Sequence, residues 1–172
     1  GLIGAAMVLA GYAASEVDRQ WLWLAIVGFI VHWFGDSLDG SLARFRQIER
    51  PRFGYFIDHS ADGLGNLMIV GGLGLSPFVR LDVAMLALAG YYLLSIHAFL
   101  AVRVLGELRL SYVSAGPTEL RLALIAMTLL MMALGHQAPR IAGLSAFDFA
   151  VAVVAGVLIV LFVVQTVVTA RR

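Results

Sequence analysis

Four aspartates and one arginine lie close together in a sequence that is otherwise rich in apolar residues. They form two pairs with the arginine between them, in the order Asp36, Asp39, Arg44, Asp58 and Asp62. The first pair is spaced i, i+3 and the second i, i+4, so each pair would share one face of a helix. Because a short loop separates the two segments, we expect antiparallel neighbouring helices whose carboxylates meet in one cleft.

This set of side chains favours hard divalent cations. Carboxylates without histidine or cysteine are the ligands that Mg²⁺, Mn²⁺ and Ca²⁺ prefer. Negative charges in one cleft repel one another, so protons or bound cations must offset them. Four carboxylates can also hold two metal ions, which stabilise the attacking and leaving oxygens when a phosphoryl group is displaced. The spacing therefore predicts a metal site beside a phosphate-bearing substrate.

Small residues are interleaved with the acids. Gly40 directly follows Asp39, and Gly54 lies one helical turn before Asp58. Both glycines would let a large group approach the backbone, and Ala43 would keep the same helix face low. Arg44 could bind a pyrophosphate group through two hydrogen bonds, or it could balance the charge of the acids.

The elements that position these residues must be largely apolar. Of the 172 residues, 61% are hydrophobic and 13% are charged, and the mean hydropathy is +0.92. A soluble domain is about half apolar and about a quarter charged. The net charge of +1 provides no field that would recruit nucleic acid. The sequence contains no cysteine, which excludes disulfides and thiolate metal sites, and no lysine.

The hydropathy pattern predicts an all-α integral membrane protein, a bundle of six transmembrane helices in one domain over residues 1–172. The expected spans are residues 1–14, 21–45, 53–76, 81–103, 118–135 and 146–169. Ser15 or Asp18 could cap the second helix, and Pro51 fits the first turn of the third. Because the chain begins inside an apolar run, we expect that its N-terminus has been trimmed.

The distribution of arginine predicts the orientation. Eight arginines lie in or beside the loops after the second and fourth spans and in the C-terminal tail, against three on the opposite side. The eight are Arg46, Arg50, Arg52, Arg103, Arg109, Arg121, Arg171 and Arg172, and the three are Arg19, Arg80 and Arg140. We therefore expect both termini in the cytoplasm, with the active site at the cytoplasmic ends of helices two and three.

The acidic stretch resembles the signature of the CDP-alcohol phosphotransferase family. All eight positions of the pattern Asp-x2-Asp-Gly-x2-Ala-Arg-x9-Gly-x3-Asp-x3-Asp match between residues 36 and 62. The resemblance implies a divalent-metal-dependent enzyme of phospholipid biosynthesis, in a multi-pass protein of the bacterial inner membrane. Such an enzyme transfers a phosphatidyl or phospho-alcohol group from a CDP-linked donor to an alcohol and releases CMP. The resemblance also suggests a homodimer.

The resemblance assigns expected roles to individual residues. Two divalent ions, Mg²⁺ or Mn²⁺, would bind the pyrophosphate of the donor. They would be held by Asp36, Asp39, Asp58 and Asp62. Asp62 matches the position of the general base, which would take the proton from the acceptor hydroxyl as that hydroxyl attacks the β-phosphorus. The nucleotide site would be formed by Asp36, Gly40, Ala43, Arg44 and Gly54.

The sequence leaves the acceptor open. His59 directly follows Asp58. This Asp-His pair resembles the motif of the choline and ethanolamine phosphotransferase branch, which uses CDP-alcohol donors. Arginines at the cytoplasmic ends of the fourth and fifth spans could instead bind inositol phosphate or glycerol phosphate, with CDP-diacylglycerol as the favoured donor. The candidates for the acceptor pocket are Arg103, Arg109, Glu119 and Arg121. Those arginines could equally serve to fix the topology alone.

Other interpretations of the acidic stretch compete with an enzyme. Intramembrane carboxylates are typical of a cation or solute transporter, whereas an EF-hand needs ligands at a spacing that this stretch lacks. The interleaved Gly-x2-Ala-Arg favours the enzyme. We interpret His32 and His97 as packing residues on apolar helices rather than metal ligands. The glycine-rich segment 63–74 would allow close helix packing, either within one bundle or at a dimer interface.

Overall fold

A computed structural model describes residues 1–45, 51–105, 117–135, 140–141 and 143–171. Within these ranges the chain is almost entirely helical, and an α-helix occupies each of the segments expected from the sequence. The helices are α1 (Leu2–Ala14), α2 (Leu22–Phe45), α3 (Pro51–Leu75), α4 (Leu81–Leu105), α5 (Pro117–Leu134) and α6 (Ala146–Ala170). A short 3₁₀ helix, η1 (Arg19–Trp21), precedes α2, and Asp18 caps it by accepting a hydrogen bond from the backbone N–H of Gln20.

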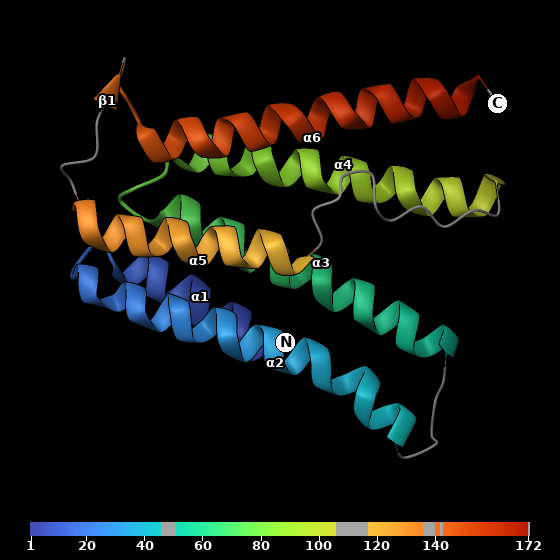
Figure 1. The fold of residues 1–172 in the computed structure, drawn as a ribbon, viewed down its shortest axis with the longest axis horizontal. Helices are drawn as coiled ribbons and strands as arrows, with labels where there is room; N and C mark the ends of the chain where they lie inside the picture. Colours follow the sequence, from blue (N-terminus) through green and yellow to red (C-terminus); the bar gives the residue numbers. More distant parts are fainter. Residues whose placement is uncertain (46–50, 106–116, 136–139, 142, 172) are drawn as a thin grey trace.

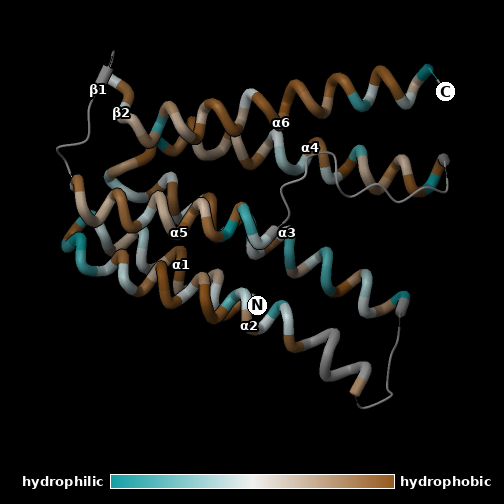
Figure 2. Tube along the Cα trace, in the orientation of Figure 1, coloured by the Kyte–Doolittle hydropathy of each residue, from teal (hydrophilic) through white to brown (hydrophobic). Residues whose placement is uncertain are grey.

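Three segments among the described residues are long and apolar enough to cross a membrane. They are Arg19–Leu38, Leu81–Val104 and Ala146–Ala170. Figure 2 shows α6 as hydrophobic over most of its length, whereas the first half of α3 is mainly hydrophilic. The all-α class is confirmed for the described part of the chain, and the expected number of six membrane crossings stays a prediction.

The helices alternate in direction along the bundle (Figure 1). The ends of α2, α4 and α6 and the start of α3 lie at one end of the molecule. The opposite end carries the ends of α1 and α5 and the start of α6. The extensive contacts are those of α1 with α2 and α3, and of α4 with α6, while α3 also packs on α4. The connections between helices therefore lie at the two opposite ends of the bundle.

Helix α1 lies between α2 and α3. The sequence predicted that α2 and α3 would be direct neighbours, but in the described residues they make few contacts with each other. Glycines explain the arrangement, because a Cβ added at Gly28 of α2 would lie 2.7 Å from the backbone nitrogen of Val8. A Cβ at Gly72 of α3 would lie 2.7 Å from the Cα of Leu9. The glycine-rich segment thus includes a position that packs within one bundle.

The buried core joins α1 to α5 through one polar contact. The ring of Tyr12 is completely buried and packs edge-on against Phe29 of α2, with ring centroids 6.4 Å apart. Its hydroxyl oxygen lies 2.7 Å from the hydroxyl of Thr128 on α5. Thr128 in turn donates a hydrogen bond to the carbonyl of Leu124, so both buried hydroxyls have partners.

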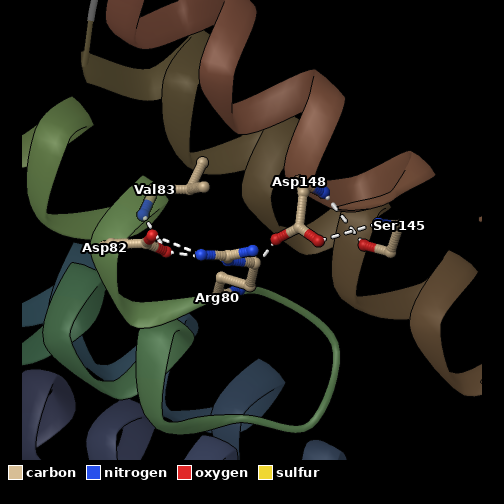
Figure 3. Close-up of polar contacts among 5 residues, drawn as sticks. All are labelled: Arg80, Asp82, Val83, Ser145 and Asp148. Atoms are coloured by element: carbon tan, nitrogen blue, oxygen red, sulfur yellow. Dashed lines mark hydrogen bonds and ion pairs between the residues drawn. The ribbon is translucent and has the colours of Figure 1, made fainter. Parts of the chain in front are cut away.

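Asp148 fastens the start of α6 to the connection between α3 and α4 (Figure 3). Ser145 and Asp148 form a reciprocal capping box at the N-terminus of α6. One carboxylate oxygen of Asp148 accepts a hydrogen bond from the backbone N–H of Ser145 at 2.8 Å, and the other accepts from that of Arg80 at 2.7 Å. The Arg80 side chain forms an exposed ion pair with Asp82.

A small hairpin between α5 and α6 adds strand structure that the sequence did not predict. Strands β1 (Arg140–Ile141) and β2 (Leu144–Ser145) are antiparallel and pair Arg140 with Ser145. Gly143 in the hairpin turn has a φ of 81°, and Gly135 has a φ of 54° directly after the last residue of α5. Both glycines adopt the left-handed conformation that other residues avoid. The remainder of the expected turn, residues 136–139, lies outside the described residues.

Candidate metal and active site

Three carboxylates from two helices converge beside the N-terminus of α1. Asp36 on α2 and Asp58 and Asp62 on α3 each offer one oxygen, and these oxygens lie within 4.8 Å of one another. Asp36 and Asp62 are half-buried, whereas Asp58 is exposed. The one-turn spacing on α3 places its two acids on the same face, as the sequence predicted. We call these three residues the carboxylate cluster.

The rest of the signature lies on the same two helices. Asp39, Gly40, Ala43 and Arg44 belong to the last turns of α2, but the described side chains do not include theirs. Gly54 is in the first turns of α3, and outside its own stretch of helix no described atom lies within 4 Å of the position that a Cβ would occupy there. The backbone of α3 is therefore open one turn before Asp58, as expected for a surface that a large ligand approaches.

A cavity of about 280 Å³ adjoins the carboxylate cluster. All three acids line it, together with His32, Ala61, Gly1 and the first residues of α1, Leu2 and Ile3. The contribution of α1 was missed because its apolar sequence carries no mark of a site. His32 could have been found from its spacing, since it lies four residues before Asp36 on the same helix face.

Arg121 on α5 reaches the carboxylate cluster. Its Nη2 atom lies 3.2 Å from Oδ2 of Asp36 and 3.3 Å from Nδ1 of His32. The Arg121 side chain is 13% exposed and that of Asp36 33%, so the ion pair is well shielded from solvent. The guanidinium partly offsets the charge that the cluster concentrates. Of the residues predicted for the acceptor pocket, Arg121 is therefore placed directly at the cluster.

The other acceptor candidates have different positions. Arg103 is exposed in the last turn of α4, and Glu119 is exposed in the first turn of α5. Arg109 lies outside the described residues. Of the arginines expected at the acceptor pocket, Arg121 therefore contacts the carboxylate cluster, whereas Arg103 lies exposed at the end of α4.

His59 belongs to an aromatic group on the side of α3 that faces α4. Its ring centroid is 4.1 Å from that of Tyr55 and 5.3 Å from that of Phe99. Its Nδ1 atom lies 2.9 Å from the carbonyl oxygen of Tyr55 and 3.7 Å from Oδ2 of Asp58. The imidazole is therefore held beside the carboxylate cluster by its own helix.

The donor set of the cluster fits a hard divalent cation. It consists of carboxylate oxygens close enough together to share one ion, and such ligands suit Mg²⁺ or Mn²⁺. Nδ1 of His32 faces Arg121 of α5. Nε2 of His32 lies so close to Gly65 of α3 that a Cβ added there would be 3.2 Å away, so the imidazole packs against both helices. The arrangement can hold a cation, accept a proton at a carboxylate and bind an anionic group.

Two comparisons relate the chain to known proteins. The sequence model of the family described as CDP-alcohol phosphatidyltransferase matches residues 2–169. The chain is also 40% identical over 83 residues to the archaetidylinositol phosphate synthase of Pyrococcus horikoshii. That match covers 48% of this chain and 44% of the relative, so the chain aligns with less than half of that protein. No solved structure matches the chain significantly.

Proposed function

The chain belongs to the CDP-alcohol phosphatidyltransferase family, and we propose that it transfers a phosphatidyl group from CDP-diacylglycerol to an alcohol and releases CMP. Membership makes the chain a membrane-associated transferase of phospholipid synthesis, in agreement with the three segments of the described residues that are long and apolar enough to cross a membrane. The observation that carries the proposal is the convergence of Asp36, Asp58 and Asp62, because these acids belong to the family signature and share one cavity.

The family is generally dependent on divalent metal, and the carboxylate cluster suits that requirement. In our proposal two Mg²⁺ or Mn²⁺ ions would be held by Asp36, Asp39, Asp58 and Asp62. Such ions, when bound, neutralise phosphate charge and lower the pKa of a nearby hydroxyl. The interleaved residues Gly40, Ala43, Arg44 and Gly54 form the surface that binds the cytidine diphosphate group.

Asp62 is the general base of the proposed reaction. Its half-buried carboxylate accepts the proton of the acceptor hydroxyl, whose oxygen forms a bond to the β-phosphorus of the donor. The bond between the β-phosphorus and the bridging oxygen breaks, and CMP leaves with that oxygen. Asp62 then returns its proton to solvent. The position of Asp62 in a cavity shared with Asp36 and Asp58 supports this role.

We propose inositol phosphate as the acceptor, ahead of glycerol phosphate. The half-buried guanidinium of Arg121 offers a positive charge at the cluster, which suits an acceptor that carries phosphate. The relative from Pyrococcus horikoshii is named for a phosphorylated inositol lipid, which favours the same choice. Arg103, Arg109 and Glu119 are further candidates for the acceptor pocket.

The proposed enzyme is a single domain over residues 1–172 that crosses a bacterial inner membrane six times. Its active site faces the cytoplasm, and the protein is a homodimer. The last turn of α4, which contains Arg103, and the end of α6, which Arg171 follows, lie at one end of the bundle (Figure 1). The start of α4, which Arg80 precedes, lies at the other end. This separation supports the orientation that arginine predicts.

The proposal is tested by an acceptor screen. Purified protein with Mg²⁺ or Mn²⁺ is given CDP-diacylglycerol and, in parallel, inositol phosphate, glycerol phosphate or serine. CDP-choline and CDP-ethanolamine with diacylglycerol test the other donor class. We expect CMP release with CDP-diacylglycerol and inositol phosphate, and loss of that release when EDTA is added. Cation flux in proteoliposomes without affinity for cytidine nucleotides would favour the transporter instead.

A further inference from the structure

His32 has a more specific environment than a packing residue requires. It is 8% exposed on α2, and its Nδ1 atom lies 3.3 Å from Nη2 of Arg121. Because a guanidinium can donate hydrogen bonds but cannot accept them, Nδ1 of His32 must be the acceptor. A neutral imidazole that accepts at Nδ1 carries its proton on Nε2. The contact with Arg121 therefore selects one tautomer of His32.

A glycine on α3 makes room for this imidazole. A Cβ added at Gly65 would lie 3.2 Å from Nε2 of His32, which is closer than side chains normally approach. The ring thus occupies a space bounded by α2, α3 and α5. Gly71, on the same helix, offers a comparison, since no described atom lies within 4 Å of a Cβ placed there.

The same nitrogen of Arg121 contacts His32 and Asp36. Its distance to Oδ2 of Asp36 is 3.2 Å, so the guanidinium bridges the imidazole and the carboxylate. Arginine has a long flexible side chain, and a second fixed partner reduces the freedom that the ion pair would otherwise leave. Both His32 and Asp36 line the cavity beside the carboxylate cluster. Fixing Arg121 therefore fixes the direction in which Asp36 presents its carboxylate.

We propose that His32 is a positioning residue, which acts through Arg121 to orient Asp36 for binding a divalent cation. The inference deepens the proposed function, since it rests on the assignment of Asp36 as a metal ligand. Replacing a residue that hydrogen-bonds to a metal ligand and orients it commonly lowers metal affinity by about 10- to 100-fold. His32 contacts neither the cation nor the substrates in this assignment.

The test measures Mn²⁺ affinity by titration calorimetry on the purified protein, without donor or acceptor. We expect His32→Phe to weaken Mn²⁺ binding about tenfold. His32→Asn should restore affinity to within about threefold, because its amide oxygen can replace Nδ1 as an acceptor. His97→Phe is the matched control, since His97 is equally buried on α4 beside Thr166 of α6. It should leave Mn²⁺ affinity unchanged.

A double-mutant cycle with Arg121→Ala separates positioning from packing. If His32 acts through Arg121, His32→Phe should cause no further loss of Mn²⁺ affinity in the Arg121→Ala protein. Gly65→Ala should reproduce part of the loss by displacing the imidazole, whereas Gly71→Ala should not. Losses that simply add in the double mutant, or unchanged affinity in His32→Phe, would overturn the inference.

The outcome is distinguishable from failure of the proposed function. Wild-type protein that binds Mn²⁺ and shows the coupled losses, yet releases no CMP with any acceptor, would contradict the transferase proposal and support the role of His32. Wild-type protein that does not bind Mn²⁺ would contradict both, because Asp36 would not be a metal ligand.

Discussion

Gly54 is a residue of the signature that lies beside open space. It precedes Asp58 by one turn of α3, and the space where its side chain would be is open. An open backbone beside acidic residues lets a bulky, negatively charged group approach both a bound cation and the helix. Conformational freedom is not required of Gly54, because it lies within a regular helix. Its value in the proposed site is therefore the absence of a side chain.

Replacing Gly54 by leucine should weaken nucleotide binding without unfolding the protein. We expect Gly54→Leu to raise the dissociation constant for CMP with Mg²⁺ roughly 10- to 100-fold, the equivalent of about 1–3 kcal/mol of overpacking. Thermal unfolding should not suffer, because leucine favours helix more than glycine does. Gly71→Leu on the same helix is the control and should leave CMP affinity unchanged. Equal affinity in wild-type and Gly54→Leu protein would exclude Gly54 from the nucleotide site.

At the scale of residues, the helical period made part of the site predictable. Asp58 and Asp62 had to share a face once α3 was recognised as a helix. The partners of His32 could not be predicted in the same way, because Arg121 is distant in sequence and reaches Asp36 through the packing of α5. The lining residues of α1 were hidden for a related reason, since nothing in an apolar segment indicates which of its ends will meet the acids.

Among the elements, α1 contributes to the site both by its packing and by its first residues. It separates α2 from α3 and brings its own N-terminal residues to the cavity. In a membrane, helices associate through close van der Waals packing, because lipid is as apolar as the side chains. Glycines at the contacts of α1 allow that approach, so the distance between Asp36 and the acids of α3 depends on positions far from the cluster.

Gly28→Ala should therefore destabilise the bundle. The added Cβ would lie 2.7 Å from the backbone nitrogen of Val8, and a backbone atom cannot move aside without shifting α1. We expect a loss of about 1–3 kcal/mol in the free energy of unfolding, measured by denaturation in detergent micelles. Gly156→Ala on α6, where the added Cβ meets open space, should show no such loss. Equal stability of the two variants would contradict the close packing of α1 on α2.

Asp148 allows a second test at this scale, away from the carboxylate cluster. Its carboxylate is 3% exposed and accepts backbone hydrogen bonds from Ser145 and Arg80. Asp148→Ala removes a helix cap and leaves the backbone N–H groups of Ser145 and Arg80 without their acceptor, so we expect roughly 2–4 kcal/mol lower stability. Asp82→Ala is the control and should lose much less, since an exposed ion pair contributes little. A similar loss in both variants would show that the α6 connection is not fixed by Asp148.

The elements themselves were largely predictable. Long apolar segments separated by polar, glycine- and proline-containing loops correspond to helices, and Pro51 and Pro117 begin α3 and α5. The capping box at Ser145 could have been found from the spacing of Ser145 and Asp148. The short hairpin could not, because strands of two residues carry no periodic pattern. The position of α1 between α2 and α3 depends on contacts that a hydropathy profile does not contain.

On the scale of the whole molecule, the arrangement of the helices bears on the proposed orientation. Connections at the two ends of the bundle carry different numbers of arginine residues, which predicts that the end bearing α2, α4 and α6 termini faces the cytoplasm. The CDP-linked donor would then meet the carboxylate cluster from that side. Orientation can be measured without replacing native thiols, because the sequence contains no cysteine.

Single cysteines at the two ends should report opposite sides of the membrane. Glu16→Cys, before η1, should react with a membrane-impermeant thiol reagent added outside intact spheroplasts. Arg171→Cys, after α6, should react in inverted vesicles and remain unlabelled in spheroplasts. The unsubstituted protein is the control for background labelling. The reverse pattern would place the active site on the outer side, and labelling of both cysteines from one side would contradict six crossings.

The central claim is that the carboxylate cluster releases CMP from a CDP-linked lipid, with Asp62 as the base. The direct measurement is CMP release by wild-type and Asp62→Asn protein given Mg²⁺, CDP-diacylglycerol and inositol phosphate. Asp82→Asn on α4 serves as the control for loss of an acidic residue. We predict full activity in wild-type and Asp82→Asn protein. In Asp62→Asn protein we predict that the rate of CMP release falls about 10²- to 10⁴-fold, while the protein keeps its ability to bind CMP. Undiminished CMP release by Asp62→Asn protein would contradict the role of Asp62 as the general base.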